Sequence, residues 1–205
     1  MRYERLLQRR GHLRVAGVDE AGRGAWAGPV VAAAVILPDL PLAELRARLP
    51  GLNDSKLLTP AQREVLRPLI LAVAVAAGVG GANAGEIDAR GIVAATRAAM
   101  ARAVAALLPA PDALLIDALP LPALALPQYV LFHADALCLS VAAASVLAKC
   151  ARDHYMAHLD VEVPGYGFVR HKGYGTAGHR EALARLGPSA VHRMSYAPLR
   201  EDVNT

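Results

Sequence analysis

An adjacent pair of carboxylates ends an apolar, strand-like run near the start of the chain. Asp19 and Glu20 close this run, and the glycine-rich turn Gly22-Arg23-Gly24 follows at once. Two buried carboxylates are costly unless positive charge neutralises them, and hard divalent cations take oxygen ligands. Glycines let a backbone approach closely, and a guanidinium can donate to two phosphate oxygens. The segment therefore predicts metal-dependent phosphodiester chemistry.

Two further carboxylates stand at the ends of predicted elements. Asp117 ends a strand at 113–117, and Asp135 opens a long helix at 135–161. Such ends gather in one cleft of an α/β sheet, where four carboxylates could hold two Mg²⁺ or Mn²⁺ ions about 3.5–4 Å apart for in-line phosphoryl displacement. An Asp at a helix start is commonly only an N-cap, and an Asp after a strand commonly belongs to a turn. On spacing alone both interpretations stay open.

The apolar patterns around these residues predict an α/β architecture with a mixed sheet flanked by helices. The first two strands, joined by the glycine turn, suggest a hairpin. Thr59 and Pro60 have the residue types of an N-cap and a first helical position. Strands are expected at 14–20, 28–37, 69–79, 113–117 and 128–132, and helices at 42–49, 60–67, 85–89, 92–108, 135–161 and 177–186.

Length and composition fit one globular domain. The chain has 205 residues, of which 55% are hydrophobic. Its longest apolar runs, 30–37 and 69–79, are shorter than the ~18 residues that span a bilayer, so no membrane association and a cytoplasmic location are expected. A net charge of +4 favours a polyanionic partner. Cys138 and Cys150 would lie about 18 Å apart on one helix, which predicts free thiols.

Seven blocks of the sequence, in order, resemble bacterial ribonuclease HII. They run across nearly the whole chain, which makes the resemblance specific. The blocks are residues 17–30, 53–56, 115–117, 142–153, 164–168, 171–176 and 192–198.

The resemblance implies a single ribonuclease H-like domain with a mixed five-stranded sheet. Its catalytic core would cover about 13–162, and a helix-and-loop extension at about 163–205 would face the substrate. The family's activity is hydrolysis of the RNA strand of RNA–DNA hybrids and nicking at ribonucleotides embedded in duplex DNA, by a two-metal mechanism that leaves 3′-hydroxyl and 5′-phosphate ends. A monomer is expected, whereas a replication clamp partner cannot be read from the residues.

The resemblance also implies roles for particular residues. The catalytic, metal-binding carboxylates would be Asp19, Glu20, Asp117 and Asp135. The turn that senses the ribose 2′-hydroxyl would be Gly22, Arg23 and Gly24, because backbone groups in a glycine turn can reach it. Tyr174 would pack at the RNA–DNA junction, with Tyr166, in a similar Gly-Tyr-Gly setting, as the alternative. A polar loop suited to a phosphate, although also ordinary turn chemistry, contains Asn53, Ser55 and Lys56.

Some residues depart from the family pattern or stay ambiguous. Leu137 and Cys138 stand where Lys and Ser are common, and Ala118 and Ala134 stand where Gly is usual. The missing lysine removes a positive charge near the carboxylates. On the long helix, Lys149 and Arg152 could meet either nucleic acid or solvent, and Asp153 is expected to pair with Arg152.

Other classes of function leave weaker signals. A non-catalytic nucleic-acid-binding module would keep the fold without needing the carboxylates. A nicotinamide-dependent oxidoreductase could use Gly78–Gly81, but Asn83 occupies the place of the third glycine. His154 and His158 have a zinc-like spacing, yet Tyr155 stands where a metalloprotease motif has Glu.

Overall fold

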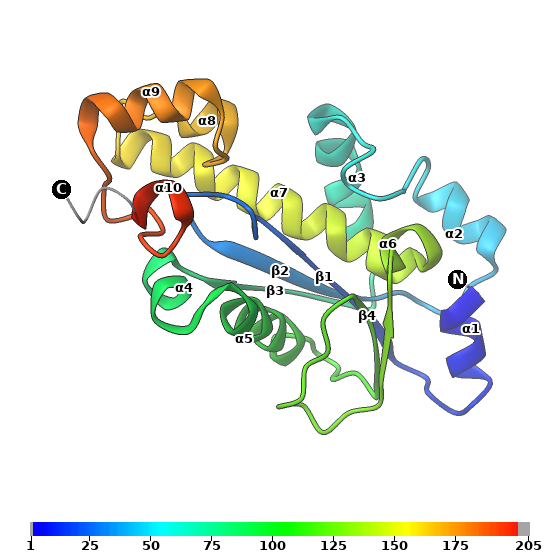
Figure 1. Ribbon diagram of the computed structural model, residues 1–205. Helices are drawn as coiled ribbons and strands as arrows, with labels where there is room; N and C mark the ends of the chain where they lie inside the picture. The colour runs from blue at the N-terminus through cyan, green and yellow to red at the C-terminus, as the bar shows by residue number, and fades with distance from the viewer. Residues whose placement is uncertain (1, 201–205) are drawn as a thin grey trace.

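The protein is built on one mixed five-stranded sheet, seen in a computed structural model that describes residues 2–200 (Figure 1). The strand order is β3-β2-β1-β4-β5. The strands are β1 Val15–Ala21, β2 Val30–Ile36, β3 Ala76–Ala82, β4 Ala113–Asp117 and β5 Gln128–Leu131. β1 and β2 form the expected antiparallel hairpin, and β1 pairs with β4 in parallel. The predicted mixed sheet is confirmed.

Helices cover both faces of this sheet. Larger helices are α3 Pro60–Val73, α5 Ile92–Ala105, α7 Leu139–Glu162 and α9 Ala177–Leu186. Shorter ones are α1 Arg2–Gln8, α2 Leu42–Arg48, α4 Ala84–Arg90, α6 Ala134–Leu137, α8 Phe168–His171 and α10 Ala197–Arg200. In the part of the chain that the structure describes, none of them is long and apolar enough to cross a membrane.

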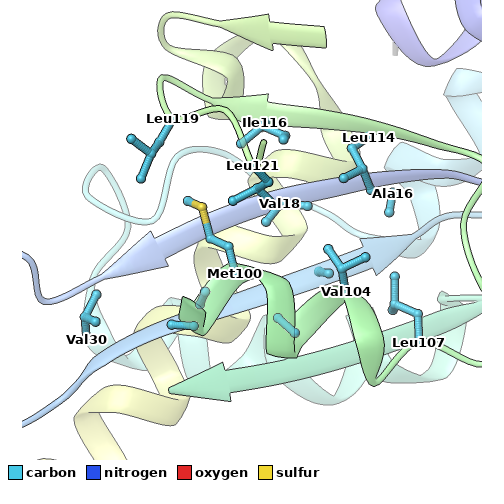
Figure 2. Packing of buried hydrophobic residues seen from close by; sticks show 14 of the residues in the cluster. Ala16, Val18, Val30, Met100, Val104, Leu107, Leu114, Ile116, Leu119 and Leu121 are labelled. Atoms are coloured by element: carbon cyan, nitrogen blue, oxygen red, sulfur yellow. The ribbon is translucent and has the colours of Figure 1, made fainter. Parts of the chain in front are cut away.

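Strand alternation divides the core between the two faces. Val18 packs with Met100 and Val104 of α5 (Figure 2). Ala33 and Val35 of β2 pack instead with residues of α3 and α7. Because successive strand residues point to opposite faces, both faces of β1 and β2 are buried and both strands are apolar almost throughout.

The third strand is not where the sequence pattern placed it. A strand at 69–79 is wrong, because α3 continues to Val73 and β3 begins at Ala76. The expected N-cap of α3 is confirmed: Thr59 accepts from Gln62 N–H, and the Gln62 side chain accepts from Thr59 N–H. Leu66 and Ile70, one turn apart, are buried and carry the helix past its predicted end at residue 67.

Glycines in β3 allow α5 to lie directly on the strand. A Cβ on Gly78 would stand 2.3 Å from the Ala103 carbonyl oxygen, and one on Gly80 would stand 2.3 Å from the Ala99 carbonyl oxygen. These glycines therefore serve helix–strand packing, the usual reason for glycine inside a strand.

The long helix predicted at 135–161 is broken near its start. Cys138 has an extended backbone, with φ −124° and ψ 123°, and separates α6 from α7. The Ser140 N–H and hydroxyl both donate to the buried Glu4 carboxylate, at 3.0 and 2.9 Å. The unpredicted helix α1 thus supplies an acceptor and a negative charge at the N-terminus of α7. Cys138 and Cys150 are free and buried, as expected.

Candidate active site

The ends of β1 and β4 bring three of the four predicted carboxylates into one cleft of about 350 Å³, which Asp19, Glu20 and Asp117 line. The parallel register pairs Val18 with Ile116, so Asp19 and Asp117, the next residue on each strand, stand at the same level. By alternation both point to the face covered by α7.

Glu20 reaches the same cleft although it follows Asp19 directly. It is next to last in β1, where the chain leaves the sheet. Its N–H donates to Asp19 Oδ1 at 2.7 Å, and its Oε1 lies 3.3 Å from Arg23 Nη1. Because β1 ends here, the side chains of Asp19 and Glu20 can both line the cleft although the two residues are adjacent.

These carboxylates are poorly compensated within the protein. Burial raises the pKa of Asp19 well above its ordinary value, and repulsion from Glu20, Asp117 and Asp135 raises this pKa further. Burial also raises the pKa of Glu20, opposed by Arg23. A divalent cation bound to these carboxylate oxygens would neutralise the accumulated negative charge of the cleft.

The carboxylates do not form a closed cage for an ion. Within residues 2–200, no three or more His, Cys, Asp or Glu side chains are gathered tightly enough to hold one unaided. Mg²⁺ in phosphoryl-transfer sites commonly binds one or two carboxylates and completes its shell with water and substrate phosphate. The donor set fits a cation of that kind.

Asp135 stands at the border of the cleft. It is buried in α6 and lines a neighbouring hollow of about 230 Å³ with Asn53 and Arg46. Lys56, which lines the main cleft, connects the two spaces, because its Nζ lies 3.7 Å from Asp135 Oδ2. Burial raises the pKa of Asp135, and repulsion from Asp54 adds to this effect.

Asp135 and Asp117 differ in the structural roles that they have in their elements. Asp135 is not an N-cap, because His133 holds the N-cap position of α6. Asp117 does have a structural role, since its Oδ1 accepts from Ala134 N–H at 2.9 Å and ties β4 to α6. Ala118, which follows Asp117, has a left-handed backbone with φ +53°.

An arginine that sequence reasoning missed holds the polar loop after α2. Arg63 of α3 is buried, and its Nη1 donates to the carbonyls of Ser55 and Leu58. Its Nη2 lies 3.6 Å from Asp153, which also accepts from Lys149 at 2.7 Å. The expected pairing of Asp153 with Arg152 is wrong. A signal was available: Arg63 shares the buried stripe of Leu66 and Ile70 at helical spacing.

The predicted loop residues divide between the two spaces. Ser55 and Lys56 line the main cleft, whereas Asn53 lines the hollow beside Asp135. Ser55 is buried, and its N–H donates to Ser145 Oγ at 3.2 Å. The Lys56 side chain is 74% exposed and places an ammonium group at the cleft edge, 3.7 Å from Asp135 Oδ2.

The glycine turn and Tyr174 also contribute to the lining of the cleft. Gly22, Arg23 and Tyr174 line the cleft, and Gly24 is not among the lining residues. Tyr166, the alternative, is buried, and its hydroxyl donates to the Gly187 carbonyl at 2.7 Å. Only Tyr174 of the two faces the carboxylates.

Two basic residues of α7 have different surroundings. Lys149 lines the cleft, with its Nζ 5.9 Å from the centre of the Tyr174 ring. Arg152 is fully buried and reaches neither solvent nor the cleft surface, so both expectations for it are wrong. His154 and His158 lie on the exposed side and pair with Glu64 and Glu162.

Comparison with known proteins identifies the fold and the family. The family model described as Ribonuclease HII matches residues 16–199. The Ribonuclease HII of Geobacillus kaustophilus is 56% identical over 201 residues, which cover 98% of this chain and 75% of the relative. This chain belongs to the ribonuclease HII family. It is a divalent-metal-dependent hydrolase, an endoribonuclease that acts on RNA–DNA hybrids, and this decides against the oxidoreductase and the non-catalytic module.

Solved structures agree with this family. The ribonuclease H2 of Pyrococcus horikoshii matches with a TM-score of 0.77 and 26% identity, over 92% of this chain and 96% of that one. The RNase HII of Archaeoglobus fulgidus, solved in a complex with PCNA, matches with a TM-score of 0.75 and 27% identity, over 90% of this chain and 96% of that one. The expected ribonuclease H-like fold is confirmed.

Proposed function

We propose that this ribonuclease HII, besides cutting the RNA strand of hybrids, nicks duplex DNA at single embedded ribonucleotides and leaves 3′-hydroxyl and 5′-phosphate ends. The observation that carries this proposal is the cleft of about 350 Å³, which is lined by the acidic residues together with Gly22, Arg23 and Tyr174. Residues suited to bind metal ions and residues suited to contact one sugar-phosphate unit therefore line the same cleft.

The acidic wall is proposed to bind the metal. Asp19, Glu20, Asp117 and Asp135 would hold two Mg²⁺ or Mn²⁺ ions between them. When bound, such ions supply an activated water and stabilise the leaving oxygen. The repulsion that raises the pKa of Asp19 supports this assignment, because a cation would relieve it.

The glycine turn and Tyr174 are proposed to select the ribonucleotide. No hydrogen bond in the described part of the chain uses the N–H groups of Gly22, Arg23 or Gly24 as donors. A ribose 2′-hydroxyl can accept such bonds, which is how proteins distinguish RNA from DNA. Arg23 would contact the adjacent phosphate, and the Tyr174 ring would pack against the junction sugar.

The loop after α2 is proposed to bind a flanking phosphate. Lys56 extends from it into the cleft edge with a largely exposed ammonium group. Asn53 and Ser55 would add polar contacts on either side. Asp135 then lies within reach of both the lysine and the substrate strand, so Lys56 would also set the position of that carboxylate.

One assay tests the activity directly. Three duplexes of one sequence are incubated with the protein: an RNA–DNA hybrid, DNA with one ribonucleotide, and DNA alone, each with Mg²⁺, Mn²⁺ or chelator. We expect metal-dependent cutting of the first two, with 3′-hydroxyl ends recovered. Cutting of the hybrid alone would reject the single-ribonucleotide proposal, and cutting of all three would indicate a general nuclease.

We also propose that one copy of the chain suffices for activity. All residues that line the cleft come from one chain, with the core of about 13–162 supplying most of them and the extension from 163 supplying Tyr174. Light scattering at assay concentration should give the mass of a monomer, and a dimer would contradict this.

A further inference from the structure

The segment that carries the glycine turn is bound through its carbonyl groups by a buried arginine near the end of the described chain. Arg193 is fully buried. Its Nε donates to the Gly28 carbonyl at 3.0 Å and its Nη1 donates to the Arg23 carbonyl at 2.8 Å. The Tyr196 hydroxyl donates to the same Arg23 carbonyl. The carbonyl of the central residue of the turn therefore points into the protein.

A second buried arginine binds the other end of this segment. Arg152 of α7 donates from Nε to the Pro29 carbonyl at 2.9 Å and from Nη2 to the Ala27 carbonyl at 3.2 Å. Two guanidinium groups, from places 41 residues apart in the sequence, thus bind four carbonyls within residues 23–29.

Arg152 also contacts both parts of the wall proposed to read the sugar. A Cβ on Gly22, whose φ is +94°, would stand 1.9 Å from Arg152 Nε. The guanidinium carbon of Arg152 also lies 5.2 Å from the centre of the Tyr174 ring. One planar group therefore contacts both the turn and the tyrosine.

Neither guanidinium makes an ion pair with a carboxylate within residues 2–200. Asp153 attracts Arg152, and Asp88 attracts Arg193, only from beyond ion-pair distance. Arg152 Nη1 and Arg193 Nη2 are buried with no hydrogen-bond partner among those residues. Burying a cation without a close counter-ion is costly to a fold. Two such cations beneath the same turn indicate a role that core packing does not explain.

We propose that Arg152 and Arg193 are positioning residues for sugar recognition. By binding the carbonyls of residues 23–29 they turn the N–H groups of residues 22–24 toward the cleft, and Arg152 sets the spacing between this turn and Tyr174. Their positive charge beneath the turn also favours a phosphate above it. This inference rests on the proposed function, since it concerns how the turn distinguishes a ribonucleotide from a deoxyribonucleotide.

The test separates recognition from folding. For wild type, Arg152→Met, Arg152→Lys and Arg193→Met, we would measure kcat and KM on a duplex with one ribonucleotide. We would also measure the inhibition constant Ki of the all-DNA duplex of the same sequence. Wild type should show KM well below Ki. In the Met variants the ratio of KM to Ki should rise at least tenfold toward one, and Arg152→Lys should fall between, since an ammonium cannot reproduce the planar fork.

A merely structural role predicts a different result. Partial unfolding lowers the amount of active enzyme, and hence the apparent kcat, but leaves the ratio of KM to Ki unchanged. That outcome would overturn the proposal. Arg97→Met is the matched control, because Arg97 also donates to a carbonyl, that of Pro120 at 3.0 Å, on the far side of the sheet. The ratio of KM to Ki in Arg97→Met should equal the ratio in wild type.

A second variant keeps the test decisive if Arg152→Met does not fold. Gly22→Ala forces a Cβ against Arg152 and should raise the ratio of KM to Ki in the same way. A wild-type ratio in Gly22→Ala would overturn the proposal. Absence of nicking by the wild-type enzyme would instead reject the proposed function, so the two failures are distinguishable.

Discussion

At the scale of single residues, the carboxylates are arranged for chemistry at the expense of stability. Asp19 is buried beside other acidic groups, and both burial and repulsion raise its pKa. The buried arginines beneath the glycine turn are the opposite case, because each is a cation with one buried nitrogen that has no hydrogen-bond partner within residues 2–200. Charges held in this way indicate a site organised around ligands that carry the complementary charge.

Replacing Asp19 should therefore separate activity from stability. In Asp19→Asn the nicking rate should fall by about 100-fold or more, because a metal site contributes several kcal/mol to transition-state stabilisation. Thermal unfolding in the presence of chelator should occur at a higher temperature than in wild type, because the amide removes a repelled charge. A lower unfolding temperature would show that this carboxylate stabilises the metal-free protein.

Replacing Ala118 should change stability without changing activity. Its φ of +53° is unfavourable for a residue with a Cβ, and it follows Asp117 directly. Ala118→Gly should raise the free energy of unfolding by up to about 1 kcal/mol, measured by urea denaturation. Activity should stay close to wild type. A loss of stability would mean that the added freedom of glycine in the unfolded chain outweighs the relieved strain.

At the scale of elements, the strand β3 shows how close packing restricts residue type. Gly80 faces α5, whereas Gly81 points away, and the nearest atom to a Cβ on Gly81 would be 3.6 Å distant. Gly80→Ala should destabilise the protein by about 1–3 kcal/mol through overpacking, and Gly81→Ala in the same strand should have a much smaller effect. Urea denaturation of the pair measures the difference. Equal losses would indicate that strand propensity, not contact with α5, decides.

Elements also show where sequence patterns succeed and fail. The hairpin around the turn and the helix 177–186 follow from alternation, glycine placement and capping residues, and all were predictable. The β3 strand was not, because its apolar signal comes from Ala and Gly, while Leu69–Val73 read equally well as the end of a helix or as a strand. The break at Cys138 is followed by Ser140, which donates to Glu4, 136 residues away, and no local pattern contains this contact.

The candidate site was predictable to a similar extent. The carboxylates, the turn and Lys56 have recognisable residue types at element ends. The supporting residues Arg63, Arg152 and Arg193 were not assigned, because a charged side chain is normally expected at the surface, and only Arg63 has a helical spacing to apolar residues that indicates burial. Their partners are backbone carbonyls, which leave no trace in residue types at all.

At the scale of the whole molecule, the extension after α7 is held together by neutral histidines. Ser189 N–H donates to His192 Nδ1, and the Nε2 atoms of His192 and His179 lie 3.1 Å apart. His179 Nδ1 then lies 3.1 Å from the Tyr174 carbonyl, to which it donates. This chain of hydrogen bonds connects the far end of the extension to the tyrosine in the cleft.

Acid should therefore loosen this part of the protein. Burial lowers the pKa of His192 to about 4, from an ordinary value near 6.5. The unfolded chain binds a proton first as the pH falls, so the stability contributed by neutral His192 is complete above about pH 6.5 and is lost progressively toward pH 4. The urea concentration at the unfolding midpoint should be lower at pH 5 than at pH 7. This decrease should be smaller in His192→Gln than in wild type. An equal decrease in both proteins would assign the effect to other groups.

The contact between Glu4 and Ser140 has a practical consequence for anyone who wishes to trim this enzyme. A minimal version starting near residue 13 would retain every carboxylate of the cleft and look complete on paper. It would nevertheless lack the acceptor that holds the first turn of α7, immediately beyond the short helix on which Asp135 stands. The first dozen residues, although remote from the chemistry in sequence, belong in any shortened nuclease.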